Sequence, residues 1–144
     1  MTVAKAVAEK KGAVQTVKPD ATIAETATIL AGANIGAVVV SQDGSKIDGI
    51  ISERDIVRGL ASDGPGVMDW PVRQLMTADV ITCAAADTLG KVMAVMTAKR
   101  IRHLPICDGD GGLTGILSIG DVVKQRLADV QAEADAMRSY ITQG

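Results

Sequence analysis

The amino-acid sequence predicts an α/β fold (α+β in its finer class) made of two tandem copies of one β-α-β-β-α unit, with an extended C-terminal helix. Two observations predict this fold. The first is an internal repeat, because residues 49–58 match residues 115–124 at an offset of 66 positions. Self-similarity at a fixed offset indicates duplicated structural units. The second is that each copy alternates short β-prone runs with stretches of helical periodicity.

The repeat keeps its register over more than thirty positions without a gap. We therefore expect two units, residues 1–66 with a linker and residues 67–144 with the C-terminal helix. Glycine and proline at 64–66 place the linker within residues 61–71. Aligned positions that share an apolar or capping character are Thr22 with Thr88, Ile23 with Leu89, Ile35 with Ile101, Val38 with Leu104, Val40 with Ile106 and Ile47 with Leu113.

Each copy is expected to open with a short strand, at residues 14–17 and 80–83, and to continue with a helix. Thr22 and Glu25 have the spacing of a capping box, which marks a helix start. Apolar side chains at helical spacing then predict the buried face of each helix. These are Ile23, Ala27 and Leu30 in the first copy and Leu89, Val92, Met93 and Met96 in the second.

A hairpin follows in each copy. In the first, residues 37–40 and 47–51 flank a polar turn at 41–45. In the second, residues 104–106 and 113–117 flank the glycine-rich turn at 108–112. A helix closes each unit, starting at about Asp55 and at about Asp121.

The second closing helix is predicted to be long. Its apolar residues recur at alternating spacings of four and three, which is a heptad seam of about two and a half repeats. The seam can pack against the body of its own chain or against a second subunit, and both interpretations stay open. Its members are Val123, Leu127, Val130, Ala134, Met137 and Ile141.

Composition limits the partners. With 47% apolar residues but no Phe, one Trp and one Tyr, the core is expected to be aliphatic. A formal net charge of −2 makes nucleic acid an unexpected partner. No leader and no apolar run of about 18 residues is found, so we expect a cytoplasmic protein without a membrane span. Cys83 and Cys107 are expected to be reduced and structural.

The signature Gly-x-hydrophobic-Ser-x-x-Asp at residues 49–55 and 115–121, with residues 100–105, resembles the tandem CBS-domain pair over roughly residues 3–125. The resemblance implies two units packed sheet to sheet about a pseudo-two-fold axis, two related clefts, and a homodimer. It also implies that the clefts bind adenosyl compounds such as AMP, ADP, ATP, NAD(H) or S-adenosylmethionine as regulatory ligands, without converting them. No cofactor is required.

Ser52 and Asp55, and their counterparts Ser118 and Asp121, precede or open a helix. Free N–H groups and the positive end of the helix dipole favour an anion there, and a carboxylate can accept hydrogen bonds from ribose hydroxyls. The same pattern is also a capping box with Asp in place of Glu. The two roles do not exclude each other.

The cations are divided between the copies. Arg102 and His103 stand at a strand start of the second copy, whereas Arg54 stands where the second copy has Gly120. If the copies face one another, a cleft can take its Asp from one copy and its cations from the other. Alternatively these are solvated surface charges. Small residues at Gly36 and Ala37 favour the close approach of a flat adenine ring.

The predicted nucleotide-binding residues are Thr16, Gly36, Ala37, Ser52, Arg54, Asp55, Thr82, Arg102, His103, Pro105, Ser118, Gly120 and Asp121. One histidine, no nucleophile beside a base, no metal-ligand spacing and no phosphate-binding loop argue against an enzyme. We therefore predict a non-enzymatic energy or redox sensor that binds AMP, ADP, ATP or NAD(H). The alternatives are an assembly module with vestigial clefts, and a binder of S-adenosylmethionine.

Overall fold

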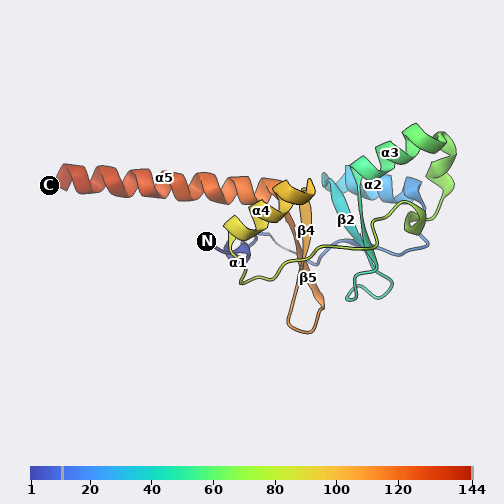
Figure 1. Cartoon of the computed structure of the whole chain (residues 1–144), viewed down its shortest axis with the longest axis horizontal. Coiled ribbons are helices and arrows are strands. Elements are labelled where there is room, and N and C mark those ends of the chain that lie inside the picture. Colours follow the sequence, from blue (N-terminus) through green and yellow to red (C-terminus); the bar gives the residue numbers. More distant parts are fainter. Residues whose placement is uncertain (11, 144) are drawn as a thin grey trace.

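The computed structural model describes residues 1–10 and 12–143, and it confirms the predicted α/β architecture of two units with a long C-terminal helix (Figure 1). Between residues 63 and 89 the chain forms two short 3₁₀ turns, Pro65–Asp69 and Val72–Gln74. The remaining elements are α1 (Val3–Ala6), β1 (Thr16–Val17), α2 (Ile23–Ala33), β2 (Ala37–Val40), β3 (Gly49–Ser52), α3 (Glu53–Asp63), α4 (Leu89–Lys99), β4 (His103–Cys107), β5 (Leu113–Ser118) and α5 (Ile119–Gln143).

The two units carry similar small sheets. In the first, β2 lies between β1, to which it is parallel, and β3, to which it is antiparallel. In the second, β4 and β5 form an antiparallel pair with an irregularity between Ile106 and Cys107. The strand predicted at residues 80–83 is wrong, because only Cys83 pairs with β4, through a single parallel bridge. Ile81 and Thr82 are exposed and have left the sheet edge.

Local contacts repeat at the offset of 66 residues and give the two units their pseudo-symmetry. The amide of Glu53 donates to the carbonyl of Gly36 at 2.9 Å, and the amide of Ile119 donates to that of Arg102 at 2.8 Å. These equivalent bonds tie the start of each closing helix to the residue just before β2 in repeat 1 and just before β4 in repeat 2. Both closing helices begin two residues earlier than predicted, because Ser52 and Ser118 stand before the first helical turn and accept a hydrogen bond from the third helical residue.

The first helix of each unit buries the face that its periodicity predicts. Thr22 and Glu25 form the predicted capping box of α2, with Ile23 and Leu30 buried. In α4, Leu89, Val92 and Met96 are buried, but Met93 is 37% exposed, so its predicted burial is wrong. One residue on from Val92 is a rotation of about 100° around a helix, which places Met93 at the margin of the buried face.

The segment that leads into each repeat packs into the hydrophobic core of the other repeat. Val3, which comes before repeat 1, is fully buried in the core of repeat 2, and its amide donates to the carbonyl of Asp87 at 2.9 Å. Val72, which comes before α4 at the start of repeat 2, is fully buried in the core of repeat 1, and its amide donates to the carbonyl of Ala21 at 2.7 Å. Within the predicted linker, residues 61–71, Val67 is also fully buried, so part of this linker is packed structure. The boundary at residue 66 stays a prediction.

The middle strand of repeat 1 is buried on both faces. Val38 and Val40 belong to the core of repeat 1, whereas Val39 is equally buried but belongs to neither core. Because successive side chains of a strand point to opposite faces, Val39 faces away from its own core. Its counterpart at the offset of 66 is Pro105, also buried in β4. This second face is where we place the contact between the repeats.

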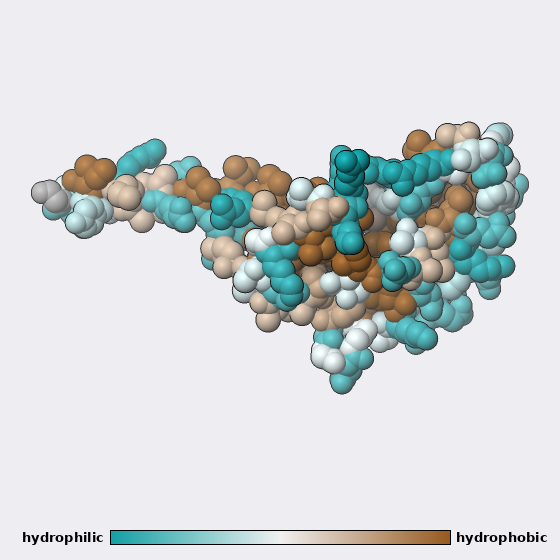
Figure 2. All heavy atoms as spheres, in the orientation of Figure 1, coloured by the Kyte–Doolittle hydropathy of each residue, from teal (hydrophilic) through white to brown (hydrophobic). Residues whose placement is uncertain are grey.

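The long helix α5 leaves the body and extends beyond it (Figures 1 and 2). The interpretation that its seam packs against its own chain is wrong for most of its length, because α1 and α4 contact only its first part and apolar side chains farther along remain exposed. Exposed fractions along the seam are 49% for Val123, 66% for Leu127, 52% for Val130, 62% for Met137 and 68% for Ile141. Among the described residues, no helix combines the length and apolarity that crossing a membrane requires.

Candidate functional site

The repeats meet where β2 and β4 begin. A Cβ atom placed on Gly36, just before β2, would lie 3.2 Å from Cε1 of His103, the first residue of β4, and 3.5 Å from Oε1 of Glu53. The His103 imidazole of repeat 2 thus lies against the backbone of repeat 1. The sequence predicted that a flat ring approaches Gly36. In this structure the ring beside it is that of His103.

Charges from three segments surround His103. Burial is the largest influence and lowers the pKa of the imidazole below its usual 6.5. Glu53 and Asp121 oppose this shift, whereas Lys10 and Arg102 add to it. Burial therefore favours the neutral form of the His103 imidazole. These influences indicate that the first turns of α3 and α5 and the N-terminal segment all lie near the His103 side chain.

Beside this contact lies an open cleft of about 270 Å³ that contains three arginines. Arg54 comes from the first turn of α3 in repeat 1, while Arg100 and Arg102 come from the turn between α4 and β4 in repeat 2. The structure thus brings Arg54 and Arg102 into one cleft, whereas the sequence predicted a cleft that takes its Asp from one copy and its cations from the other. Three guanidinium groups beside the first turns of two helices make the cleft attractive to an anion. Its other lining residues are Met96, Thr97, Ile101 and Ile119.

The two signature carboxylates cap their helices. Asp55 Oδ2 accepts from the amide of Ser52 at 2.9 Å, and the amide of Asp55 donates back to Ser52 Oγ at 3.2 Å. Asp121 and Ser118 repeat both bonds, at 2.9 and 3.1 Å. The capping-box interpretation is confirmed in both copies. Ribose binding by the same carboxylates stays a prediction.

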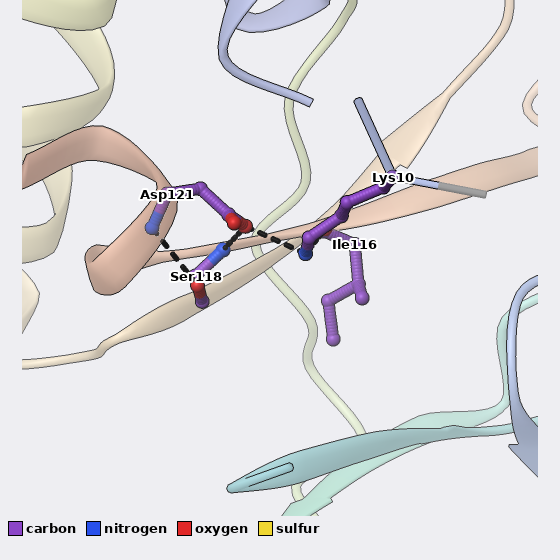
Figure 3. A network of polar contacts seen from close by, with 4 residues as sticks. All are labelled: Lys10, Ile116, Ser118 and Asp121. Atoms are coloured by element: carbon purple, nitrogen blue, oxygen red, sulfur yellow. Dashed lines mark hydrogen bonds and ion pairs between the residues drawn. The ribbon is translucent and has the colours of Figure 1, made fainter. Parts of the chain in front are cut away.

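Lys10 reaches the second of these carboxylates, which the sequence did not indicate (Figure 3). Its Nζ lies 2.6 Å from Asp121 Oδ2 and donates to the carbonyl of Ile116 at 2.9 Å. Lys10 belongs to the N-terminal segment, outside every motif, and only the packing of that segment on repeat 2 places it here. No signal in the sequence distinguishes Lys10 from the neighbouring lysines.

Thr82 lies apart from the arginines. It lines a second open groove, of about 700 Å³, between the hairpin of repeat 1 and the segment before α4. Burial raises the pKa of the Cys83 thiol in this groove to about 11, and burial also raises that of Cys107. Both cysteines are free thiols. The groove is lined by Lys46, Ile47, Ala78, Asp79, Val80, Thr82, Cys83, Ala84, Asp87, Cys107, Asp108, Gly109 and Gly111.

The other predicted residues take supporting positions. Thr16 lies half-buried in β1, paired with Val39. Ala37 is buried at the start of β2, and Pro105 is buried in β4 opposite Ile116. Gly120 is exposed in the first turn of α5. The predicted set is therefore spread over the junction of the repeats and the groove of Thr82, not gathered in one pocket.

Known proteins share both sequence and fold with this chain. The family model of the CBS domain matches this chain twice, over residues 7–62 and residues 72–128. A mitochondrial CBS domain-containing protein of Arabidopsis thaliana is 33% identical over 129 residues, which are 87% of this chain and 62% of that protein. The chain thus spans less than two thirds of the length of that relative.

Two solved structures show the likeness of fold. A CBS-domain containing protein of Agrobacterium tumefaciens is 40% identical, with a TM-score of 0.83 over 88% of this chain and 99% of that one. A CBS domain protein of Pyrobaculum aerophilum, solved as a complex with AMP, is 28% identical, with a TM-score of 0.73 over 84% of this chain and 89% of that one. With two matched domains, a shared architecture and the doubled signature, this chain belongs to the CBS-domain family and carries a tandem CBS pair.

Proposed function

We propose that this CBS pair is a non-catalytic regulatory module that binds an adenine nucleotide, AMP, ADP, ATP or NAD(H), between its repeats. The observation that carries the proposal is the cleft shared by Arg54 of repeat 1 with Arg100 and Arg102 of repeat 2. Guanidinium groups are planar donors that bind phosphate oxygens in pairs. A phosphate held by arginines of both repeats bridges them.

Nearby groups suit the rest of a nucleotide. Asp55 and Asp121 are half-buried carboxylates at helix starts, and an ionised carboxylate accepts the two hydroxyl hydrogens of a ribose. His103 and Gly36 form the junction beside them. The AMP complex of the Pyrobaculum aerophilum protein, which shares the fold, supports an adenosyl ligand.

The three arginines also favour phosphorylated ligands over S-adenosylmethionine. The sulfonium of that compound carries a positive charge, which the guanidinium groups repel, whereas a phosphate is attracted. We take S-adenosylmethionine as the competing ligand in the test below.

Occupancy produces a signal because the cleft has walls from both repeats. A ligand that touches Arg54 and Arg102 together stabilises the arrangement in which these residues are close. The shift in packing can be no larger than the difference in the ligand's affinity for the two arrangements. A change in phosphate number or in redox state of the ligand would then alter the contact between the repeats, as an energy or redox sensor requires.

The test is isothermal titration of AMP, ATP, NADH, adenosine and S-adenosylmethionine into the wild type and Arg54→Gln. Removing one charged phosphate contact is expected to weaken the phosphorylated ligands by about tenfold or more and to leave adenosine nearly unchanged. Arg58→Gln, an exposed position on the same helix, is the matched control. Equal loss in Arg54→Gln and Arg58→Gln would mean that bulk charge, not the cleft, attracts the ligand. Binding of S-adenosylmethionine in preference to AMP would overturn the ligand assignment.

We also propose a second function, assembly of two copies through α5. The observation that favours it is the exposed apolar seam on a helix that extends beyond the body (Figure 2). In a two-stranded coil, Leu127, Ala134 and Ile141 would occupy one core position and Val123, Val130 and Met137 the other. A parallel arrangement places Glu133 of one copy beside Arg138 of the other, because flanking residues five apart in sequence meet across such a coil.

Light scattering after size exclusion tests the assembly. The wild type is expected at twice the mass of the chain, whereas Leu127→Glu, with a charge in the seam, is expected at a single mass. Ala132→Glu, on an exposed position away from the seam, is the control and is expected to stay dimeric. A wild type of single mass at high micromolar concentration would remove α5 from the assembly.

A further inference from the structure

Corresponding residues of β3 and β5 meet different partners. In repeat 1, Ile50 exchanges two backbone hydrogen bonds with Thr77, each of 2.9 Å. At the offset of 66, the equivalent residue of repeat 2 is Ile116, and its carbonyl accepts from Nζ of Lys10 at 2.9 Å. A lysine ammonium therefore stands in repeat 2 where a backbone amide stands in repeat 1.

The position of this ammonium makes the two signature carboxylates unequal. Asp121 Oδ2, whose side chain is 17% exposed, accepts the Ser118 amide and also lies 2.6 Å from Lys10 Nζ. Asp55 Oδ2 instead accepts from the amide and the hydroxyl of Ser52. Among the ion pairs of residues 1–10 and 12–143, none involves Asp55. Figure 3 shows Lys10 and Ser118 on the two sides of the Asp121 carboxylate, each joined to Asp121 by dashed lines.

Lys10 and Arg102, one of the cations that the proposed function assigns to phosphate, act on the same imidazole. The imidazole of His103 is influenced by Lys10, Asp121 and Arg102 together. The side chain of Lys10 is 45% exposed and ends a flexible four-carbon stem. Its ammonium can thus leave Asp121 for the phosphate of a ligand bound beside it without any change of the fold.

We propose that Lys10 is a specificity-determining residue of the Asp121 site, which selects phosphorylated adenosyl ligands over their non-phosphorylated counterparts. The inference rests on the proposed function. A ribose that approaches Asp121 competes with Lys10 for the carboxylate. A ligand with a phosphate gives Lys10 a new anionic partner and frees Asp121 for the ribose, whereas adenosine displaces Lys10 without giving it one.

The experiment measures the ratio of AMP to adenosine affinity by calorimetry in an Asp55→Asn background, which isolates the Asp121 site. Asn keeps one side-chain oxygen for the Ser52 amide. In this background Lys10→Gln removes the charge but keeps a donor for the Ile116 carbonyl. We expect adenosine to bind more tightly and AMP more weakly, so that the ratio falls about tenfold. Lys10→Arg, which keeps the charge, is expected to retain the ratio.

The control is Lys5→Gln, an exposed lysine of the same N-terminal segment, for which the ratio is expected to be unchanged. An unchanged ratio in Lys10→Gln, while AMP still binds, would overturn the role of Lys10 and leave the proposed function standing. Equal tightening of both ligands would also overturn it, because Lys10 would then only obstruct the site. Failure of the wild type to bind either ligand would overturn the proposed function, and this inference with it.

Discussion

The exchange of preceding segments between the repeats makes an unusual prediction for Val3. Val3 lies near the N-terminus, before repeat 1, yet its side chain is fully buried in the core of repeat 2 with Leu89, Val92 and Leu117. We expect Val3→Ala to destabilise the distant repeat more than the adjacent one. The substitution would thus act on the repeat that is farther from Val3 in the sequence.

The magnitude follows from the burial. Val3→Ala removes two buried methyl groups, at about 0.8 kcal/mol each for transfer. A cavity adds to this where the surroundings relax only in part. The free energy of unfolding is therefore expected to fall by about 2–3 kcal/mol. Val57→Ala, at a position 63% exposed on α3, is the control and is expected to change it by less than about 0.5 kcal/mol.

Urea denaturation measures the loss, and native-state hydrogen exchange locates it. In Val3→Ala, amides of α4, β4 and β5 are expected to lose more protection than those of α2, β2 and β3. The reciprocal variant Val72→Ala should show the opposite pattern, because Val72 is buried in the core of repeat 1. Loss of protection confined to repeat 1 in Val3→Ala would refute the exchange.

Three further predictions concern single sites. Gly49→Ala should cost about 1–3 kcal/mol of stability, because its Cβ would lie 2.9 Å from the Thr77 carbonyl, whereas Gly115→Ala should cost less, with 3.3 Å to a side-chain methyl. The folded pKa of His103 is lowered, so stability should be greatest above pH 6.5 and fall towards pH 5, and thermal scans of His103→Gln should lack this fall. Iodoacetamide at pH 8 should label Cys107 before buried Cys83, whose pKa is about 11. Equal losses of stability in Gly49→Ala and Gly115→Ala would contradict the first prediction. A stability that does not change between pH 6.5 and pH 5 would contradict the second, and faster labelling of Cys83 than of Cys107 would contradict the third.

Local features of the fold were predictable because they depend on neighbours in sequence. The capping box of Thr22 and Glu25 and the hairpins around the polar turns follow from short-range hydrogen bonds and from alternation, and the structure contains them. The register of the repeat then predicted the second unit from the first. Helical periodicity does not decide the burial of a residue at the margin of the apolar face, and Met93 of α4 was therefore predicted as buried although it is exposed.

Features that depend on the contact between the repeats were not predictable. The packing of Val3 on repeat 2 and the pairing of Lys10 with Asp121 join residues more than 80 positions apart, and neither belongs to a motif. The strand predicted at residues 80–83 was wrong because β propensity alone does not form a strand. A neighbouring strand must pair along the whole segment, and only Cys83 has such a partner. The meeting of Arg54 and Arg102 in one cleft was not predicted either, because the sequence combined the Asp of one copy with the cations of the other.

Thermal unfolding of the wild type with AMP, ADP, ATP, NADH, adenosine and S-adenosylmethionine tests the central claim most directly. A ligand at a hundredfold excess over its dissociation constant adds about 2.7 kcal/mol to the stability of the native state, or about 5 to 10 °C for a domain of this size. The proposed function predicts such a shift with phosphorylated adenosyl ligands and a smaller one with adenosine. No shift with any of the six compounds would contradict it and would leave assembly through α5 as the function to pursue.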